Sequence, residues 1–299
     1  MSSRRLHFIV NPSAGRGRGA KSVHLIREKM ESLGSGYGLS VTSGSGEATK
    51  LAAVAAKEAD IVVAVGGDGT INEVVNGIYD RGVTLGILPV GSGNDFVKML
   101  SIPTDAERAL ELLFGGAERK VDLGIVNDRL FVNSVGLGID AAVARTMNRT
   151  GWLRGKTAYH YGVLTNLFFY RCKAIRWDAD GETGETKSLL AAVMNGTTYG
   201  GDFNVAPKAK CDDGLLDLVI AGRFGLLGRA RCLPAFKKGK HLALPKVVWR
   251  RAKKIHIASE AVLPIQTDGE LLSLSGVGTD VDIEVIQGGL RVVAAPLAA

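Results

Sequence analysis

The chain has 299 residues, a length that fits two packed domains of roughly 150 residues each. Its hydrophobic share of 46% and charged share of 22% are those of a globular protein and argue against general disorder. No apolar run reaches the roughly 18 residues of a membrane-spanning helix, and the first residues lack the apolar length of a signal peptide. We therefore do not expect a secreted or integral membrane protein.

The first 120 or so residues alternate between two patterns. Apolar runs that suit buried parallel strands lie at residues 6–10, 39–42, 60–65 and 84–88. Apolar residues at helical spacing, or alanine-rich stretches, lie at residues 23–33, 48–57, 71–78 and 105–114. Strands that alternate with helices predict a parallel sheet covered on both faces.

After residue 120 the pattern changes to successive strands. Strand-like runs lie at residues 121–126, 129–135, 174–178, 188–194, 215–221, 254–258, 281–286 and 290–295, with helices at 157–170 and 226–237. Such runs predict an antiparallel sandwich or barrel. The fold class is therefore α/β plus β, with an α/β domain at residues 1–122 and a β domain at residues 123–299. We leave open that the last residues pack back on the first domain.

Charge and cysteine content restrict the partners. The net charge of +7 favours an anionic partner such as a nucleotide, a nucleic acid or an acidic membrane surface. Three scattered cysteines give no disulfide framework and suit a reducing compartment. No zinc site is expected, because the histidines and cysteines show no metal-ligand spacing.

The most specific motif is the string Val-Gly-Gly-Asp-Gly-Thr-Ile-Asn-Glu at residues 65–73, which lies between a buried strand and a helix. Gly66 and Gly67 let the backbone approach a phosphate without a Cβ in the way, and the helix N-terminus behind them supplies N–H groups. Asp68 would repel a phosphate unless a cation bridged the two, which suits Mg²⁺. The structural alternative is a tight strand-to-helix turn with an aspartate cap.

Two further loops have the same character. The Pro-Val-Gly-Ser-Gly-Asn-Asp-Phe segment at 89–96 follows the next strand, and a loop rich in glycine and arginine at 11–19 follows the first. Either could be an ordinary β-to-α loop, and the latter matches neither the Walker nor the dinucleotide fingerprint. Because parallel strands present their carboxyl ends at one edge of the sheet, the three loops together predict a single nucleotide-phosphate site.

Two acidic turns stand out in the second half. Residues 206–217 place three carboxylates around a glycine turn, which suits either a solvated hairpin or a cation site made of a carboxylate and backbone carbonyls. The string Gln-Thr-Asp-Gly-Glu at residues 266–270 lies between an apolar run and another strand. By its chemistry alone it suits an ordinary Asp-Gly turn, with a functional site as the alternative.

Taken together, these strings resemble the bacterial diacylglycerol kinase-like lipid kinases, a family related to the eukaryotic diacylglycerol, sphingosine and ceramide kinases. The resemblance covers essentially the whole chain. It implies an N-terminal α/β nucleotide-binding domain with a parallel sheet, a C-terminal antiparallel β-sandwich domain and an active site between them. The strings that carry it lie at residues 11–15, 66–70, 91–96, 121–124, 195–196, 207–214 and 268–270.

The resemblance also implies roles for individual residues. Asp268 would accept the proton of the lipid hydroxyl. Asp213, with the main-chain carbonyls of Lys210 and Leu215, would hold a structural Mg²⁺. Asp95, Asp122 and Glu270 would form a supporting acidic network. Asp68 would join Asp95 and Asp122 in it. ATP would lie over Asn11, Ser13, Thr42, Gly66, Gly67, Asp68, Gly69, Thr70, Asn72, Glu73 and Ser92.

The resemblance thus implies an ATP- and Mg²⁺-dependent cytoplasmic kinase that phosphorylates a membrane lipid, with diacylglycerol as the first choice. Transient contact with an anionic membrane would involve the basic residues 237–241 and 246–254, for which a merely solvated cationic surface is the alternative. A sphingosine, ceramide or phosphatidylglycerol kinase, an NAD kinase and a nonenzymatic nucleotide-binding regulator are the competing functions. Nucleic acid is not expected, because no binding motif is present. The oligomeric state stays open, a homodimer included.

Overall fold

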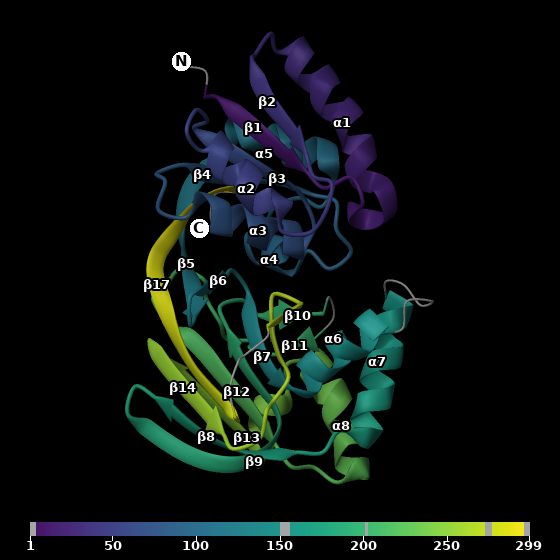
Figure 1. Ribbon diagram of the computed structural model, residues 1–299, viewed down its shortest axis with the longest axis vertical. Helices are drawn as coiled ribbons and strands as arrows, with labels where there is room; N and C mark the ends of the chain where they lie inside the picture. The colour runs from purple at the N-terminus through teal and green to yellow at the C-terminus, as the bar shows by residue number, and fades with distance from the viewer. Residues whose placement is uncertain (1–3, 150–155, 201–202, 273–276, 296–299) are drawn as a thin grey trace. The chain divides into compact units, whose positions relative to one another are not determined.

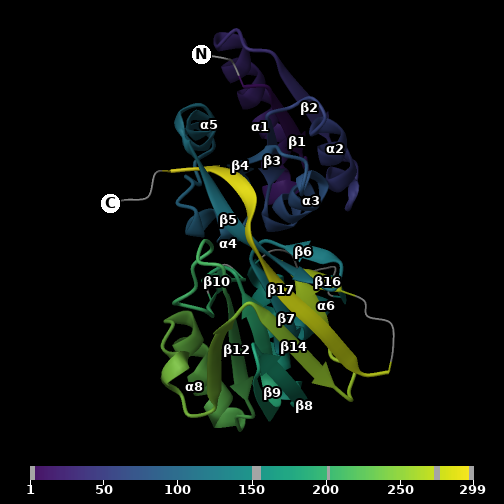
Figure 2. The same ribbon diagram turned by 90° about the vertical axis from the view of Figure 1, so that its left-hand side faces the viewer.

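The computed structural model describes all residues except 1–3, 150–155, 201–202, 273–276 and 296–299 (Figures 1 and 2). The chain forms two compact units: unit 1 comprises Met1–Asp122 and Gly288–Ala299, and unit 2 comprises Leu123–Gln287. The chain passes between the units along two strands that pair with each other, β5 (Ala117–Val126) and β17 (Thr279–Ala294).

Unit 1 contains a parallel sheet in the order β2-β1-β3-β4, which the end of β17 extends beside β4. Its strands are β1 (Leu6–Val10), β2 (Tyr37–Val41), β3 (Ile61–Gly66) and β4 (Thr84–Pro89). Its helices are α1 (Ala14–Ser32), α2 (Glu47–Ala55), α3 (Asp68–Ile78), α4 (Asp95–Met99) and α5 (Ala106–Gly115).

The core of unit 1 follows from its apolar patterning. Every residue of β3 and β4 is buried, as expected for central strands with both faces covered. Ile71, Val74, Val75 and Ile78 recur at helical spacing in α3 and are all buried. The predicted α/β class of the first half is therefore confirmed.

Unit 2 is predominantly antiparallel, which confirms the second half of the predicted fold class. Its strands besides β5 and β17 are β6 (Arg129–Phe131), β7 (Ser134–Gly138), β8 (Lys173–Ala179), β9 (Glu182–Met194), β10 (Thr198–Tyr199), β11 (Phe203–Asn204), β12 (Leu216–Gly222), β13 (Val247–Ala252), β14 (Lys254–Ser259), β15 (Ile265–Thr267) and β16 (Glu270–Leu272). Its helices are α6 (Ile139–Arg149), α7 (Lys156–Phe169), α8 (Leu226–Lys237) and the 3₁₀ turn η1 (His241–Ala243).

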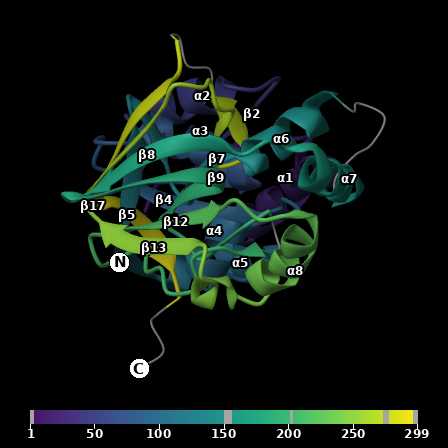
Figure 3. The ribbon, with the colours of Figure 1, turned by 90° about the horizontal axis from the view of Figure 1, so that it is seen from below.

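Two buried apolar clusters hold unit 2 together. The larger one takes alternating residues from β7, β8, β9, β12, β14 and β17, as the two-residue period of a strand requires. The smaller one lies between the other face of β9 and β12 and helix α8, where it includes Met194 and Phe236. Helices α6, α7 and α8 are drawn together in Figure 3.

Several predicted elements differ from those observed. The single strand predicted at 129–135 is divided into β6 and β7, and the two strands predicted at 281–286 and 290–295 are one continuous strand, β17. Helices α4 and α6 and strand β13 were not predicted. The loop predicted at 11–19 lies largely within α1, whose first turn is interrupted by left-handed residues such as Gly15. No helix among the described residues is long and apolar enough to cross a membrane.

Candidate active site

The loops after β1 and β3 are joined by a side-chain hydrogen bond. Asn11 donates from Nδ2 to Oγ1 of Thr70, in the first turn of α3, at 3.0 Å. Its Oδ1 accepts the backbone N–H of Ser13 at 3.1 Å, which turns the start of the first loop. Gly66 permits this arrangement, because a Cβ there would lie 2.3 Å from the Thr70 side chain. Four predicted ATP-binding residues thus pack together at the end of the sheet.

The loops after β3 and β4 are joined by Asp68. Its Oδ2 accepts the backbone N–H of Asn94 at 2.8 Å. Its Oδ1 accepts the N–H groups of Asp95 at 2.9 Å and Phe96 at 3.5 Å. A carboxylate that accepts N–H groups at the start of a helix satisfies donors that would otherwise lack partners, here those of α4. Asp68, whose charge suggested a bridging cation, thus holds the third loop in place.

The backbones of these two loops are also in direct contact. Val90 and Gly91 donate their N–H groups to the carbonyl oxygen of Gly66 at 2.9 and 3.2 Å. A Cβ on Gly91 would lie 2.4 Å from Cα of Gly67, which no side chain could tolerate without displacement of the backbone. Glycine is therefore required here by the neighbouring loop, independently of any ligand.

Arg18 links the first loop to the third. Its Nη2 donates to the carbonyl oxygen of Gly91 at 2.6 Å and its Nε to that of Gly15 at 3.2 Å. Gly15 has a φ of +58°, and a Cβ there would lie 1.8 Å from the carbonyl oxygen of Val90. The three loops that follow β1, β3 and β4 therefore contact one another, as expected for loops at the same edge of a parallel sheet.

The electrostatic environment of this loop cluster suits an anion. Gly67 occupies the N-cap position of α3 and provides no side-chain cap. The N-terminus of that helix therefore directs N–H groups and the positive end of its dipole toward the loops. Arg18 adds a formal positive charge beside the third loop.

The other residues predicted to contact ATP lie in different surroundings. Thr42 is buried just after β2. Glu73 accepts two backbone N–H groups at the start of α2, at 2.8 and 3.0 Å, so its carboxylate fixes that helix. Asn72 is buried within α3, whereas Ser92 is exposed in the third loop.

Asp268, the predicted proton acceptor, belongs to unit 2 and lies in the turn between β15 and β16. Asp268 and Gly269 have φ values of +48° and +91°, as in a type I′ hairpin turn. The Asp268 carboxylate accepts three backbone N–H groups, those of Val132 at 2.8 Å, Asn133 at 3.0 Å and Ser134 at 2.8 Å. These charge-assisted bonds fix the orientation of the carboxylate against the segment between β6 and β7.

A second carboxyl group supports the same turn. Gln266 accepts the N–H of Gly269 at 2.6 Å through Oε1 and donates from Nε2 to Oδ2 of Asp140 at 3.2 Å. Burial raises the pKa of Asp140 to about 6, against the opposing effect of the Gln266 hydrogen bond. The proximity of Gln266 and Asp140 depends on the packing of α6 against β15, which joins segments far apart in the sequence.

The three residues of the predicted acidic network have separate partners. Glu270 pairs with Arg129 on the neighbouring hairpin. Asp95 contacts the ammonium of Lys98 at 3.1 Å. Asp122 is buried and accepts the N–H of Gly288 at 2.7 Å, so its carboxylate joins β5 to β17 where both strands leave unit 1.

The predicted Mg²⁺ ligand Asp213 lies in the turn before β12. Its Oδ1 accepts the N–H of Leu215 at 3.2 Å, and its Oδ2 pairs with the guanidinium of Arg251. Nε of the same arginine lies 3.8 Å from Oδ2 of Asp217. One cation is thus shared by two carboxylates.

Asp217 gives an independent indication that a cation fits this turn. It is buried, and its Oδ1 accepts the indole N–H of Trp249 at 2.6 Å. Its Oδ2 is buried and has no hydrogen-bond partner among the residues that the structure describes. Burial raises the pKa of Asp217, and the neighbouring Asp213 raises it further. A hard divalent cation held by Asp213 and the carbonyls of Lys210 and Leu215 would offset this negative charge, so the residues present fit Mg²⁺.

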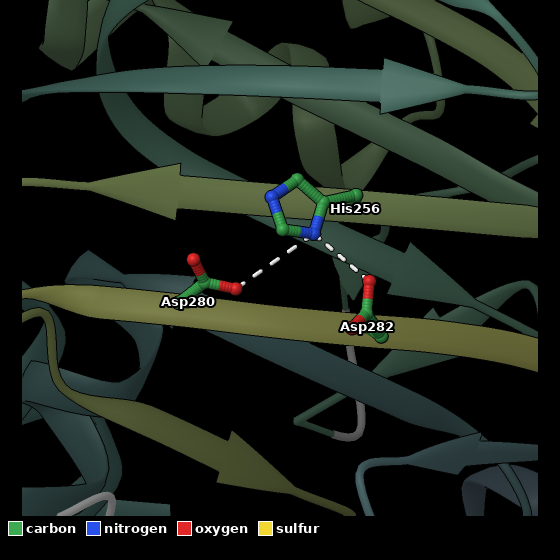
Figure 4. Close-up of side chains that lie close together, drawn as sticks. All are labelled: His256, Asp280 and Asp282. Carbon is green, nitrogen blue, oxygen red and sulfur yellow. Dashed lines mark hydrogen bonds and ion pairs between the residues drawn. The ribbon is translucent and has the colours of Figure 1, made fainter.

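A group of possible metal ligands outside the predicted site is formed by His256, Asp280 and Asp282 (Figure 4). His256 lies directly opposite Asp282 in the β14–β17 pair. Its Nδ1 lies 2.9 Å from Asp282 Oδ1 and 3.8 Å from Asp280 Oδ1. Both aspartate side chains are 77% exposed. We interpret the group as a cross-strand ion pair on a solvated sheet face.

Two asparagines of unit 2 support the Asp268 turn and were not assigned roles from the sequence. Asn133 donates its backbone N–H to Asp268 and its side-chain N–H to the Thr198 carbonyl at 2.9 Å. Asn195 is fully buried and donates from Nδ2 to the carbonyl of Val132 at 2.8 Å. Asn195 directly follows the buried end of β9, and a polar residue in that position is a signal that could have identified it.

Comparison with known proteins identifies both units. Residues 5–126 match the diacylglycerol kinase catalytic domain. Residues 133–294 match the YegS C-terminal NAD kinase beta sandwich-like domain. Among curated proteins, the diacylglycerol kinase of Bacillus subtilis strain 168 is 30% identical over 272 residues, which cover 89% of this chain and 90% of that protein. The diacylglycerol kinase of Staphylococcus aureus strain MRSA252 is 32% identical, with coverage of 89% and 86%.

Solved structures show the same fold. A Bacillus anthracis crystal structure, of a protein provisionally called a diacylglycerol kinase, matches with a TM-score of 0.82 at 27% identity and covers all of both chains. Yeast NADH kinase in complex with NADH matches with a TM-score of 0.55 at 12% identity, over 98% of this chain and 84% of that one. The second likeness concerns the fold alone.

Proposed function

Because the chain belongs to the diacylglycerol kinase family, whose members are kinases, we propose that it transfers the γ-phosphate of ATP to the hydroxyl group of diacylglycerol. The product would be phosphatidic acid. The observation that carries the proposal is the interlocking of the three loops around Asp68 in unit 1, because it builds a rigid anion-binding cluster at the carboxyl end of a parallel sheet.

The nucleotide would bind to this loop cluster. Its phosphates carry negative charge that the N-terminus of α3 and the backbone N–H groups of the loops can stabilise. Phosphoryl transfer needs little covalent assistance and depends on alignment, so a preorganised cluster suits it. The Mg²⁺ that accompanies ATP would neutralise charge on the β- and γ-phosphates.

Asp268 would act as the general base. A lipid hydroxyl is a weak nucleophile near neutral pH, and a carboxylate that accepts its proton makes the oxygen reactive. In the step, the hydroxyl proton passes to the Asp268 carboxylate, the new O–P bond forms, and the bond between the γ-phosphorus and the bridging oxygen of ADP breaks. The three backbone N–H groups on Asp268 support this role, because they hold the carboxylate in a single orientation.

The chain's own residues would also hold a structural Mg²⁺. Asp213 would supply a carboxylate, and Lys210 and Leu215 would supply their main-chain carbonyls. The ion would balance the charge of Asp213 and Asp217 and thereby stabilise the turn before β12.

The experiment is the transfer of labelled phosphate from ATP to a panel of acceptors: diacylglycerol, phosphatidylglycerol, sphingosine, ceramide and NAD. We expect label in diacylglycerol and a dependence on Mg²⁺. Transfer to NAD alone would show that the protein is an NAD kinase and would contradict the proposal that it phosphorylates a lipid. Transfer to another lipid would retain the lipid kinase and replace its substrate.

Asp268→Asn tests the base against a matched control. Asp180 lies in an equivalent turn, with φ values of +50° for itself and +91° for Gly181, and its carboxylate also accepts backbone N–H groups, those of Lys253 and Lys254. We expect turnover to fall by about a hundredfold to ten-thousandfold in Asp268→Asn. Asp180→Asn should keep nearly full turnover. Equal turnover in the two variants would refute the role of Asp268.

The kinase would work at a membrane surface, where its substrate is dissolved. We expect transient binding to anionic membranes from the cytoplasmic side, driven in part by basic residues and weakened by salt.

A further inference from the structure

A cluster of exposed apolar side chains lies on two neighbouring helices of unit 2. Near the end of α7 these are Leu164, Phe168 and Phe169, with exposed fractions of 58%, 52% and 80%. At the start of α8 they are Leu226 and Leu227, with 59% and 78%. We name these five residues the α7–α8 apolar patch. Contiguous exposed apolar surface of this kind marks an interaction site in soluble proteins.

The two helix ends are held together by a buried arginine. Arg229 of α8 is only 8% exposed. Its Nη1 donates to the carbonyl oxygen of Leu167 in α7 at 2.8 Å, and its Nε donates to that of Phe224 at 3.2 Å. Figures 1 and 3 both draw α7 and α8 next to each other. The apolar residues of the two helices therefore form one surface.

The two chain segments that carry the patch are basic. Neither residues 156–177 nor residues 218–259 contain an aspartate or glutamate. Arg171, Lys173, Arg223 and Arg231 are exposed, and none of these four forms an ion pair with a described residue. An apolar surface bordered by unpaired cations is complementary to an anionic bilayer, whose head groups are negative and whose interior is apolar.

The second basic stretch predicted from the sequence, residues 246–254, is less suited to that role. Its cations are largely neutralised within unit 2: Arg250 pairs with Glu182, Arg251 with Asp213, and Lys254 with Glu284. Positive charge that is already paired attracts anionic lipid weakly. The docking surface is therefore better placed at the α7–α8 end than on β13.

We propose that the α7–α8 apolar patch inserts into the surface of an anionic membrane and that the arginines and lysine around it bind lipid phosphates. The inference rests on the proposed function, in which the substrate is a membrane lipid. Insertion would fix unit 2 at the depth where the hydroxyl of that lipid lies. The bilayer, rather than a protein, is the occupant that matches both the apolar residues and the positive charge of the two segments that carry them.

The test uses the full chain and two vesicle compositions, one with phosphatidylglycerol and phosphatidylcholine and one with phosphatidylcholine alone. We compare the wild type with Phe169→Asp and Leu227→Asp, and with Val262→Asp as the matched control. Val262 is 66% exposed in unit 2 and lies on a loop outside both helices. Co-sedimentation measures binding without any need for catalysis, and circular dichroism with thermal unfolding verifies that each variant is folded.

We expect the wild type and Val262→Asp to bind anionic vesicles and to prefer them to neutral ones. Each patch variant should bind at least about tenfold more weakly. The substitution replaces a large apolar side chain with a negative charge, which the anionic vesicle surface repels. Patch variants should phosphorylate vesicle-embedded diacylglycerol slowly while keeping wild-type turnover on a short-chain, water-soluble diacylglycerol.

The two proposals fail separately. If the wild type binds vesicles through the patch but phosphorylates no lipid, the proposed function is wrong and the docking surface stands. If the folded patch variants bind like the wild type, or if the wild type does not bind anionic vesicles, the docking surface is overturned. A concentration-dependent dimer that the patch variants abolish, with vesicle binding unchanged, would assign the patch to a second copy of the chain and equally overturn it.

Discussion

Asp68 and Asn94 lie in different loops of unit 1 and are joined by a 2.8 Å hydrogen bond, in which the backbone N–H of Asn94 donates to Oδ2 of Asp68. Asp68, the acidic residue of the glycine-rich motif after β3, therefore holds the loop after β4. The motif thus also forms a structural link between two loops.

Asp68→Asn should weaken ATP binding by loosening that link. An amide keeps one acceptor oxygen but places an NH₂ group toward a backbone N–H, and a lost buried hydrogen bond costs about 1–3 kcal/mol. We expect the dissociation constant for ATP, measured by calorimetry, to rise about tenfold or more. Asp105→Asn is the control, since Asp105 caps α5 through the N–H of Arg108 in the same unit. If both variants bind ATP like the wild type, Asp68 does not organise the site.

Gly91→Ala tests the contact between the second and third loops. Its Cβ would lie 2.4 Å from Cα of Gly67, so one loop must move. We expect a loss of stability of about 1–3 kcal/mol and an increase in KM for ATP. Gly44→Ala is the matched control, because Gly44 has nothing within 4 Å of the added Cβ. Thermal unfolding and steady-state kinetics separate the two effects, and a Gly91 variant indistinguishable from the Gly44 variant would contradict the prediction.

Asp140→Asn should change how stability depends on pH. Its pKa of about 6 exceeds the ordinary 3.8, so between these values the folded protein binds more protons than the unfolded chain. The wild type therefore loses stability as the pH rises through this window. The asparagine variant lacks this loss and should be more stable than the wild type near pH 8, by about 1–3 kcal/mol, but not near pH 4. Urea unfolding at both pH values provides the measurement, and a difference that does not vary with pH would rule out this account.

Arg251→Met should make stability depend on Mg²⁺. Without the guanidinium, Asp213 and Asp217 have lost the cation that they share, so the variant should unfold at a lower temperature in the presence of EDTA. Added Mg²⁺ should then raise the melting temperature more than it does in the wild type, because binding to the folded state stabilises it.

Asp213→Asn supplies the companion measurement. It removes a ligand as well as a charge, so its melting temperature should respond to Mg²⁺ less than that of the wild type. If Mg²⁺ raises the melting temperatures of the wild type and both variants equally, the ion binds elsewhere.

Much of unit 1 could be predicted because its signals are local. The apolar runs that become β1, β3 and β4 are buried on both faces, and the helical spacing of Ile71, Val74 and Ile78 identifies one face of α3. Glycine-rich loops that follow three buried strands predicted that these loops would meet at one edge, because parallel strands present their carboxyl ends on the same side of the sheet.

Unit 2 was harder to predict because antiparallel strands are divided or joined by partners distant in the sequence. The pairing of β17 with β14, and then with β4, keeps residues 279–294 in a single strand through the two glycines at its centre. Strand β13 has a basic sequence that suggested a surface for lipid, and its pairing with β12 brings Arg251 beside Asp217 instead.

The sequence by itself determined the fold class and pointed to the candidate site residues, because periodicity and residue type are properties of short segments. The tertiary structure alone decided what those residues touch: Asp68 a neighbouring loop, Asp268 three backbone N–H groups, and Asp213 an arginine. Hydrogen bonds and ion pairs form between groups that distant strands bring within about 3 Å. No local pattern contains that information.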